Sequence, residues 1–412
     1  MNRTILHCDM NNFYASVECM LHPEWRGKPV AVCGETEERH GIVLAKNYEA
    51  KAFGVTTGEA VWQAKQKCPG LILAKPHYEE YLRISDAARA MYGEYTDMVE
   101  PLGMDECWLD ITASRRLFGD GETVAHTLRE RIKRELGVTV SVGVSFNKVF
   151  AKLGSDMKKP DAVTVIPPDR FREIVWHLPA SDLFGVGRAT ARRLHPLGIH
   201  TIGDLAVYPP EYLRAKLGKC GEDIRRFANG LDSSPVVSRG IADLDKTAGH
   251  GITTLRDLVS DGEVWPVLLE LAQDVGHRLR LYDRKATGVA IAIRDRELRC
   301  KQWQCRLPYP TRSALILARE AFALFCRSYS WGSPLRSVTV RAIDLVESDI
   351  PYQLDMFTDA AAIRRREVLD RTVEELRARF GPNAIRNAVL LRNPKMPGSN
   401  VMGRDTGRSA AE

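Results

Sequence analysis

The sequence predicts a multidomain protein in which an α/β region is followed by a small helical region and then by an α+β region. Through residue 165, short apolar segments alternate with segments of helical spacing. Between residues 179 and 230, short helical segments joined by glycine turns replace this pattern. Residues 247–345 return to strands, in the order strand, helix, strand, strand, helix, strand. A length of 412 residues is consistent with two to four such domains.

The elements of the first region follow from apolar runs and from helical periodicity. The strands expected from short apolar runs are Thr4–Cys8, Pro29–Val32, Ile42–Ala45, Cys107–Ile111 and Val138–Val144. The helical segments are Phe13–Leu21, Ala60–Lys67, the long amphipathic stretch His77–Met98, and Ala125–Leu136. This alternation predicts a mixed sheet covered by helices.

The remaining regions are separated by changes in composition. The predicted divisions are residues 1–170, 171–232, 233–246 (a polar linker), 247–345, 346–393 and 394–412. The α+β region is of the split βαβ type, with segments Gly249–Thr254, Val264–Tyr282, Ala286–Ile293, Arg299–Arg306, Thr311–Tyr329 and Leu335–Ala342. A helix is expected at Arg364–Phe380, with Leu369, Val373, Leu376 and Phe380 on one face, and the Gly/Ser/Arg-rich residues 394–412 are expected to be disordered.

Composition favours a cytoplasmic protein without a membrane segment. The net charge of +6 permits a nucleic-acid partner without demonstrating one. Nine cysteines are scattered without a CxxC pair or a zinc-type cluster, which is typical of reduced thiols. The N-terminus has no charged and apolar leader of the secretory kind, and no apolar run reaches the ~18 residues of a membrane span.

Three acidic residues lie where apolar strands begin or end. Asp9 follows the apolar run that starts at Ile5, and Asp105 and Glu106 directly precede a second run. Burying a carboxylate costs several kcal/mol unless it is paired or binds a metal. Oxygen ligands from two strands suit Mg²⁺, although caps of turns or lysine partners would also explain these acids.

Five collinear motifs lend the chain a resemblance to a known family. They are DMNNFYASVE at Asp9–Glu18, NYEAKAFGV at Asn47–Val55, MDECWLD at Met104–Asp110, GVSFNK at Gly143–Lys148, and Ala151-Lys152 with DMKKP at Asp156–Pro160. In this order they resemble the motifs of the Y-family DNA polymerases, and within that family those of the bacterial polymerase IV branch. The resemblance covers roughly residues 1–357. It implies a right-hand polymerase with palm and fingers at 1–170, a helix–hairpin–helix thumb at 171–232 and a little finger at 247–345.

The resemblance assigns roles to the residues of these motifs. Asp9, Asp105, Glu106 and the backbone carbonyl of Met10 would hold two Mg²⁺ ions, and Tyr14 would be the steric gate that excludes a 2′-hydroxyl. Tyr48, Lys51 and Lys159 would bind the triphosphate of the incoming dNTP. The family often has Asp where this chain has Asn11, which is not one of the three ligands carried over. It usually has Arg where this chain has Lys51, which replaces a bidentate fork by a point charge.

The contacts with DNA follow from two further segments. Leu183–Arg188 resembles a helix–hairpin–helix turn, in which Gly185 and Gly187 let the backbone approach a phosphate beside Arg188. The resemblance also implies DNA contacts by Lys148 and Lys152. Basic residues in and beside the strands of 247–345 would follow phosphates, namely Lys246, Arg294, Arg299, Lys301, Arg336 and Arg341.

The segment QLDMF at 353–357 resembles the peptide by which bacterial polymerases bind the sliding clamp. Gln353 would bond at the rim of the clamp pocket, and Leu354, Met356 and Phe357 would supply the apolar contacts. From composition alone, packing of these apolar residues on their own domain is the alternative. Family members often carry this peptide at the extreme C-terminus, whereas 55 residues follow it here.

The resemblance therefore implies a monomeric DNA-directed DNA polymerase that extends a primer–template with dNTPs. It implies low fidelity, translesion synthesis and no proofreading exonuclease, since no second set of acids is apparent. Three alternatives make different predictions. An inactive relative acting as an adaptor should lack a metal ligand. A nucleotide cyclase should have neither a thumb nor residues 247–345. A helix–hairpin–helix nuclease or ligase would not need the motif that carries Tyr14.

Overall fold

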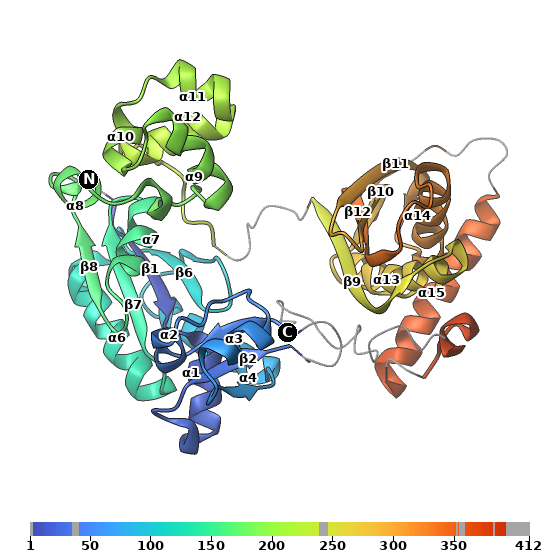
Figure 1. Cartoon of the computed structure of the whole chain (residues 1–412), viewed down its shortest axis with the longest axis horizontal. Helices are drawn as coiled ribbons and strands as arrows, with labels where there is room; N and C mark the ends of the chain where they lie inside the picture. Colours follow the sequence, from blue (N-terminus) through green and yellow to red (C-terminus); the bar gives the residue numbers. More distant parts are fainter. Residues whose placement is uncertain are drawn as a thin grey trace. The chain divides into compact units, whose positions relative to one another are not determined.

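The computed structural model describes residues 3–34, 41–238, 246–351, 353, 359–381 and 384–392. The chain separates into two compact units, of which the first comprises Met1–Gly34 and Ile42–Ala242 and the second includes everything from Asp243 onward. Figure 1 shows the elements of both units coloured along the sequence. No helix in these described ranges is long and apolar enough to cross a membrane. The expected tail at 394–412 lies outside the described residues.

The centre of the first unit is a five-stranded sheet with the strand order β5-β6-β1-β7-β8. Its strands are β1 (Ile5–Met10), β5 (Val99–Pro101), β6 (Glu106–Asp110), β7 (Val140–Ser145) and β8 (Val163–Ile166). The helices beside it are α1 (Phe13–Leu21), α4 (Tyr78–Gly93), α5 (Arg115–Phe118), α6 (Gly121–Leu136) and α7 (Lys148–Met157). The central strand β1 is antiparallel to both neighbours, and all six of its residues are buried. A strand buried on both faces is mostly apolar, and in β1 only His7 and Asp9 depart from that composition.

A smaller three-stranded sheet, with the order β3-β2-β4, occupies the segment between α1 and α4. It contains β2 (Val30–Cys33), β3 (Val43–Lys46) and β4 (Ile72–Ala74), together with α2 (Tyr48–Ala52), α3 (Val61–Lys67) and the 3₁₀ turn η1 (Pro23–Trp25). Helix α2 begins at Asn47, whose side chain accepts a hydrogen bond from the Ala50 N–H at 3.0 Å. This N-cap places Tyr48 and Lys51 on the first turns of a short helix.

A helical region completes the first unit. Its elements are α8 (Phe171–Val175), η3 (Ala180–Asp182), α9 (Arg188–Leu194), η4 (His195–Leu197), α10 (Ile202–Val207), α11 (Pro210–Leu217) and α12 (Lys219–Ala228). Its core includes Leu194, Ile202, Leu205, Leu213 and Ile224. Helix α10 starts with a capping box in which Thr201 and Asp204 satisfy each other's backbone N–H groups.

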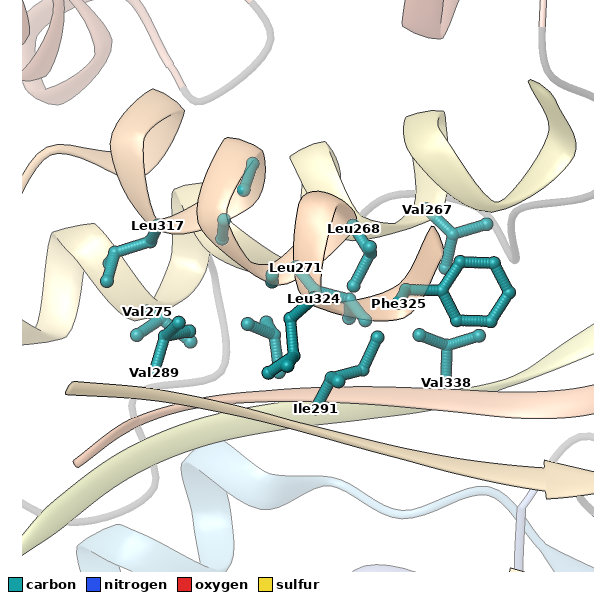
Figure 2. Packing of buried hydrophobic residues seen from close by; sticks show 14 of the residues in the cluster. Val267, Leu268, Leu271, Val275, Val289, Ile291, Leu317, Leu324, Phe325 and Val338 are labelled. Carbon is teal, nitrogen blue, oxygen red and sulfur yellow. The ribbon is translucent and has the colours of Figure 1, made fainter. Parts of the chain in front are cut away.

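The second unit is a four-stranded antiparallel sheet, with the order β11-β10-β12-β9, and two helices packed against it. The strands are β9 (Thr247–Leu258), β10 (Arg284–Asp295), β11 (Cys300–Thr311) and β12 (Leu335–Glu347), and the helices are α13 (Asp261–Leu281) and α14 (Ala314–Ser328). Figure 2 shows the helical side chains meeting those of the strands in one apolar layer. The residues labelled there are Val267, Leu268, Leu271 and Val275 of α13, Leu317, Leu324 and Phe325 of α14, and Val289, Ile291 and Val338 of the sheet.

The C-terminal helix α15 (Ala360–Phe380) begins four residues before its predicted start and is followed by η5 (Ala388–Arg392). Its contacts with α13 are polar. Glu374 pairs with Arg280 (Nε to Oε2, 2.6 Å) and with His277, and Arg377 donates to Gln273 at 2.6 Å. Of the apolar face expected for this helix, Leu369 and Phe380 are exposed, whereas Val373 and Leu376 are half-buried.

Other predicted elements were confirmed with shifted ends. The helix expected at 77–98 ends at Gly93, because Thr96 leaves the helical path and its hydroxyl donates to the Asp110 carbonyl of the sheet at 2.7 Å. Helix α6 begins at Gly121 instead of residue 125, because the Asp120 side chain caps it by accepting from the Thr123 N–H at 2.8 Å.

Candidate active site

The register of the central sheet brings the three predicted acids together. Asp9 is the direct cross-strand partner of Glu106, and the Met10 N–H donates to the Asp105 carbonyl at 2.9 Å. The side chain of Asp9 is 7% exposed and that of Glu106 is 23% exposed. Acids separated by about a hundred positions therefore meet at one edge of the sheet, as the sequence predicted.

Two lysines form ion pairs with two of these acids, Asp9 and Glu106. Lys159 Nζ lies 2.7 Å from Asp9 Oδ2 and 2.8 Å from Asp156 Oδ1. Lys152, on α7, lies 2.6 Å from Glu106 Oε2. The sequence had assigned Lys159 to a triphosphate and Lys152 to DNA, and the structure places the two ammonium groups on Asp9 and Glu106.

A close approach of α7 to the sheet places Lys152. A Cβ atom on Gly143 of β7 would lie 1.9 Å from the Ala151 carbonyl oxygen, so only glycine permits this distance. The N-cap Asn147 starts the helix by accepting from the Phe150 N–H at 2.8 Å. The GVSFNK motif thus sets where α7 begins and how near it comes to β1.

The acids have strongly altered proton affinities. Burial raises the pKa of Asp9 to about 7, with Glu106 adding to the effect and Lys159 opposing it. Burial also raises the pKa of Asp105. At Glu106, burial acts in the same direction but is outweighed by His7 and Lys152, which lower its pKa to about 2. This spread is typical of a functional site where charge is concentrated in a poorly solvated place.

The donor set fits hard divalent cations. Three carboxylates offer oxygen ligands of the kind that Mg²⁺ prefers, and two of them, Asp9 and Glu106, are paired with lysines. Within the described ranges, no three acidic, histidine or cysteine side chains already converge as a finished metal cage. Binding would therefore require Asp9 and Glu106 to turn from their lysines toward the ion.

Tyr14 lies beside this edge of the sheet in a cluster of tyrosines. Its ring stacks on that of Tyr81 with the centroids 4.3 Å apart and an interplanar angle of 9°. Its hydroxyl donates to the Met104 sulfur at 3.4 Å. Tyr81 is fully buried and donates its own hydroxyl to Glu18, which is also fully buried. The predicted steric gate is thus backed by a second aromatic ring that a buried carboxylate holds.

Comparison with known proteins identifies the family. Family models match residues 8–156 (impB/mucB/samB family), 181–232 (DNA polymerase-iota, thumb domain) and 245–356 (impB/mucB/samB family C-terminal domain). The DNA polymerase IV of Acetivibrio thermocellus is 50% identical over 393 residues, which cover 95% of this chain and 98% of that protein. The chain belongs to the Y-family DNA polymerases, in their polymerase IV branch.

Other relatives agree with this assignment. The DNA polymerase IV 1 of Bacillus subtilis is 38% identical over 399 residues, covering 95% of this chain and 94% of that protein. A solved structure of a Y-family DNA polymerase chimera, Dbh-Dpo4(243-245)-Dbh, has a TM-score of 0.75 at 23% identity and covers 84% of this chain and 99% of its own. The expected fold class is therefore confirmed, and this Y-family member is a DNA-directed DNA polymerase that binds a primer–template. Y-family polymerases use divalent metal ions.

The predicted nucleotide-binding residues lie on the smaller sheet's helix α2. Tyr48 is half-buried, and burial raises its pKa, with Asp9 adding to the rise and Lys159 opposing it. Lys51 is exposed, with its Nζ 5.8 Å from the centre of the Tyr48 ring. Its ammonium group is free to meet an anion from solvent.

The predicted DNA-binding residues differ in their accessibility. In the thumb turn, Leu183 and Val186 are buried, whereas Gly185, Gly187 and Arg188 are exposed. Gly185 has φ +89°, a conformation that favours glycine. Lys148 is 12% exposed and pairs with Glu100 at 2.6 Å, so it is engaged within the palm.

The expected clamp-binding peptide falls mostly outside the described residues. Leu354, Met356 and Phe357 are not described, and Gln353 is exposed.

Sequence reasoning missed several residues around the acids. His7 is fully buried, with its Nδ1 2.8 Å from Ser155 Oγ and its Nε2 3.5 Å from Glu106 Oε2. Asn11 donates to Ser141 Oγ at 2.9 Å and accepts from the Asp161 N–H at 2.9 Å, which ties the Lys159 segment to β1. A polar residue inside an otherwise apolar strand was the available signal for His7.

Proposed function

We propose that this polymerase extends a primer with dNTPs by two-metal nucleotidyl transfer, at low fidelity and across damaged templates, without a proofreading exonuclease. The observation that carries the chemistry is the meeting of Asp9, Asp105 and Glu106 at one edge of the palm sheet. Membership of the Y-family supports the remaining points. We further propose that the protein is a cytoplasmic monomer.

The three carboxylates and the Met10 carbonyl would hold two Mg²⁺ ions. When bound, such ions activate the 3′-hydroxyl and stabilise the leaving pyrophosphate. Lys159 and Lys152 would then be released from Asp9 and Glu106. Lys159 would join Tyr48 and Lys51 at the triphosphate, where its charge meets an anion in place of a carboxylate. Tyr14, held flat against Tyr81, would present its ring to the sugar.

The proposed domains are the palm and fingers (1–170), the thumb (171–232), the linker (233–246) and the little finger (247–345). The exposed thumb turn at Gly185 and Gly187 supports contact with a phosphate. In the little finger, the helices cover one face of the sheet (Figure 2). Successive side chains of a strand point to opposite faces, so every second side chain points away from the helices. These include Arg294, Arg306 and Arg341, which would follow the DNA backbone without reading its sequence.

Residues 346–393 would tether the enzyme to the bacterial sliding clamp through Gln353, Leu354, Met356 and Phe357. The pattern of these residues and the exposure of Gln353 support this proposal. A tethered polymerase with a weak grip on DNA rebinds the primer end before it diffuses away, because the tether raises its effective concentration.

Primer extension by Asp105→Asn tests the chemistry. The amide keeps the shape of the side chain and removes one metal-binding charge, so we expect the rate to fall at least ~10³-fold with the fold intact. Asp97→Asn, at an exposed position before β5, is the matched control and should extend primers normally. Normal synthesis by Asp105→Asn would refute the metal assignment. Extension across a panel of defined lesions, with the error frequency measured on intact template, tests the translesion role.

A further inference from the structure

A tight turn carries the middle acid of the site. Residues Leu102–Asp105 connect β5 to β6, and the N–H groups of Leu102 and Gly103 both donate to the Glu106 carbonyl, at 3.0 and 3.3 Å. Asp105 is the last residue of this turn. The orientation of the turn therefore decides where the Asp105 carboxylate points.

Among the described residues, the Asp105 carboxylate has no lysine partner of the kind that the other two acids have. Asp9 pairs with Lys159 and Glu106 with Lys152. Within the part of the chain that the structure describes, no other side chain forms a hydrogen bond or an ion pair with Asp105. Its position must accordingly come from the backbone of the turn.

Two side chains of helix α4 form hydrogen bonds with that backbone. Ser85 Oγ donates to the Met104 carbonyl at 2.5 Å, and Arg89 Nη2 donates to the Gly103 carbonyl at 2.8 Å. Residues four apart lie on one face of a helix, so a single face of α4 holds two successive peptide groups. With the Met10 N–H on the Asp105 carbonyl, three consecutive carbonyls of the turn are fixed.

The nature of Arg89 indicates more than packing. Its side chain is only 14% exposed, and burying a guanidinium is costly where an apolar residue would fill the same space. It also lines a cavity of about 330 Å³ beside Asp86, Thr96 and Val99, so it does not fill its surroundings. Two polar contacts distinguish it from a methionine of similar length: the hydrogen bond to the Gly103 carbonyl at 2.8 Å and an ion pair with Asp86 at 3.3 Å. The ion pair stays within α4, so the hydrogen bond to Gly103 is the one that reaches the turn.

We propose that Ser85 and Arg89 are positioning residues that fix the Asp105 carboxylate for metal binding. This inference rests on the metal role proposed above for Asp105. Rates fall steeply when reacting groups move by even ~1 Å, so loosening the turn should lower catalysis without removing any ligand. The effect should fall on metal affinity and on the rate of the chemical step, and hardly on nucleotide binding.

The experiment compares Arg89→Met and Ser85→Ala with Arg83→Met, in the full-length enzyme. Arg83 lies on the same helix but is 62% exposed and pairs only with Glu80 among the described residues, so it is the matched control. Mn²⁺ binding is measured by electron paramagnetic resonance in a complex with a dideoxy-terminated primer–template and dNTP. Single-turnover extension gives the rate and the nucleotide affinity, and thermal unfolding reports the fold.

We expect Arg89→Met and Ser85→Ala to weaken Mn²⁺ binding several-fold and to slow extension ~10-fold, with nucleotide affinity within about two-fold of wild type. Arg89→Lys should recover part of both, because its ammonium can still donate one hydrogen bond. Wild-type metal affinity and rate in both variants, whatever their melting temperature, would overturn the inference. If Asp105→Asn itself leaves Mn²⁺ binding unchanged, the proposed metal site fails instead.

Discussion

The tyrosine pair behind the active site allows a prediction that separates stability from sugar selection. Tyr81→Phe keeps the ring stacked on Tyr14 but removes the hydroxyl that donates to the buried Glu18. Burial, reinforced by Glu18, raises the pKa of Tyr81, so the phenol is protonated and acts as a donor at neutral pH. Tyr81→Leu removes the hydroxyl and the ring together.

The cost of each change follows from these contacts. A hydrogen bond to a charged group contributes about 1.5–3 kcal/mol. Glu18 keeps its contact with His77 Nδ1 at 2.9 Å in the Phe variant, so we expect a loss near 2 kcal/mol. For a unit of this size, that lowers the melting temperature by roughly 4–8 °C. Tyr81→Leu loses the same hydrogen bond and also the ring stacking of about 0.5–1.5 kcal/mol, so it should cost roughly 3–4 kcal/mol.

Sugar selection should respond differently. Stacking of two rings contributes about 0.5–1.5 kcal/mol, so an unsupported Tyr14 should lose up to roughly 10-fold in discrimination between dNTP and rNTP. Tyr81→Phe should discriminate like wild type. The assay is single-nucleotide incorporation from each pool, with thermal unfolding alongside and Tyr212→Phe, at an exposed thumb position, as the control. A folded Tyr81→Leu enzyme with wild-type discrimination would refute the view that Tyr81 supports the gate.

Further predictions concern single steps of the proposed mechanism. Tyr14→Ala should admit ribonucleotides while DNA synthesis survives, and unchanged discrimination would mean that another residue guards the sugar. Lys51→Ala should raise the nucleotide KM and Lys51→Arg should be tolerated, so wild-type kinetics for the alanine variant would reduce Lys51 to a surface charge. Because burial raises the pKa of Asp9 to about 7, a proton competes with metal below neutrality, and the Mg²⁺ concentration for half-maximal rate should fall as pH rises from 6 to 8; a flat profile would contradict this. Gln353→Ala with Phe357→Ala should abolish clamp binding and leave clamp-free synthesis near wild type, whereas retained clamp binding would refute the motif.

The sequence predicted those parts of the site that a local pattern encodes. An acid at the end of an apolar run marks a carboxylate at the border of a core, and this pattern singled out Asp9, Asp105 and Glu106 while leaving turn caps and lysine partners open as explanations. Their assignment to a metal came from the resemblance to the Y-family motifs. The strand pairing then placed Asp9 opposite Glu106. The helical spacing of Phe13–Leu21 likewise predicted α1 with its observed ends.

What the sequence did not predict depends on contacts between distant segments. Lys152 is 46 positions from Glu106, and Lys159 is 150 from Asp9, so no local pattern pairs them. In the sequence, Ser85 and Arg89 are ordinary polar positions of an amphipathic helix. Their role depends on hydrogen bonds to the turn at Gly103, which only the structure shows. Helix α7 was not predicted, because it has only ten residues with a glycine among them and its start depends on the Asn147 cap.

The lysines that pair with Asp9 and Glu106 affect whether the protein needs a metal ion in order to fold. Structural zinc domains gain their folding free energy from the metal, so chelators denature them. Here the acids already have cationic partners, and the palm sheet can assemble around them in the absence of any ion. Removing magnesium should therefore abolish polymerase activity while the protein stays folded and resistant to proteases. Activity should return as soon as the ion is restored.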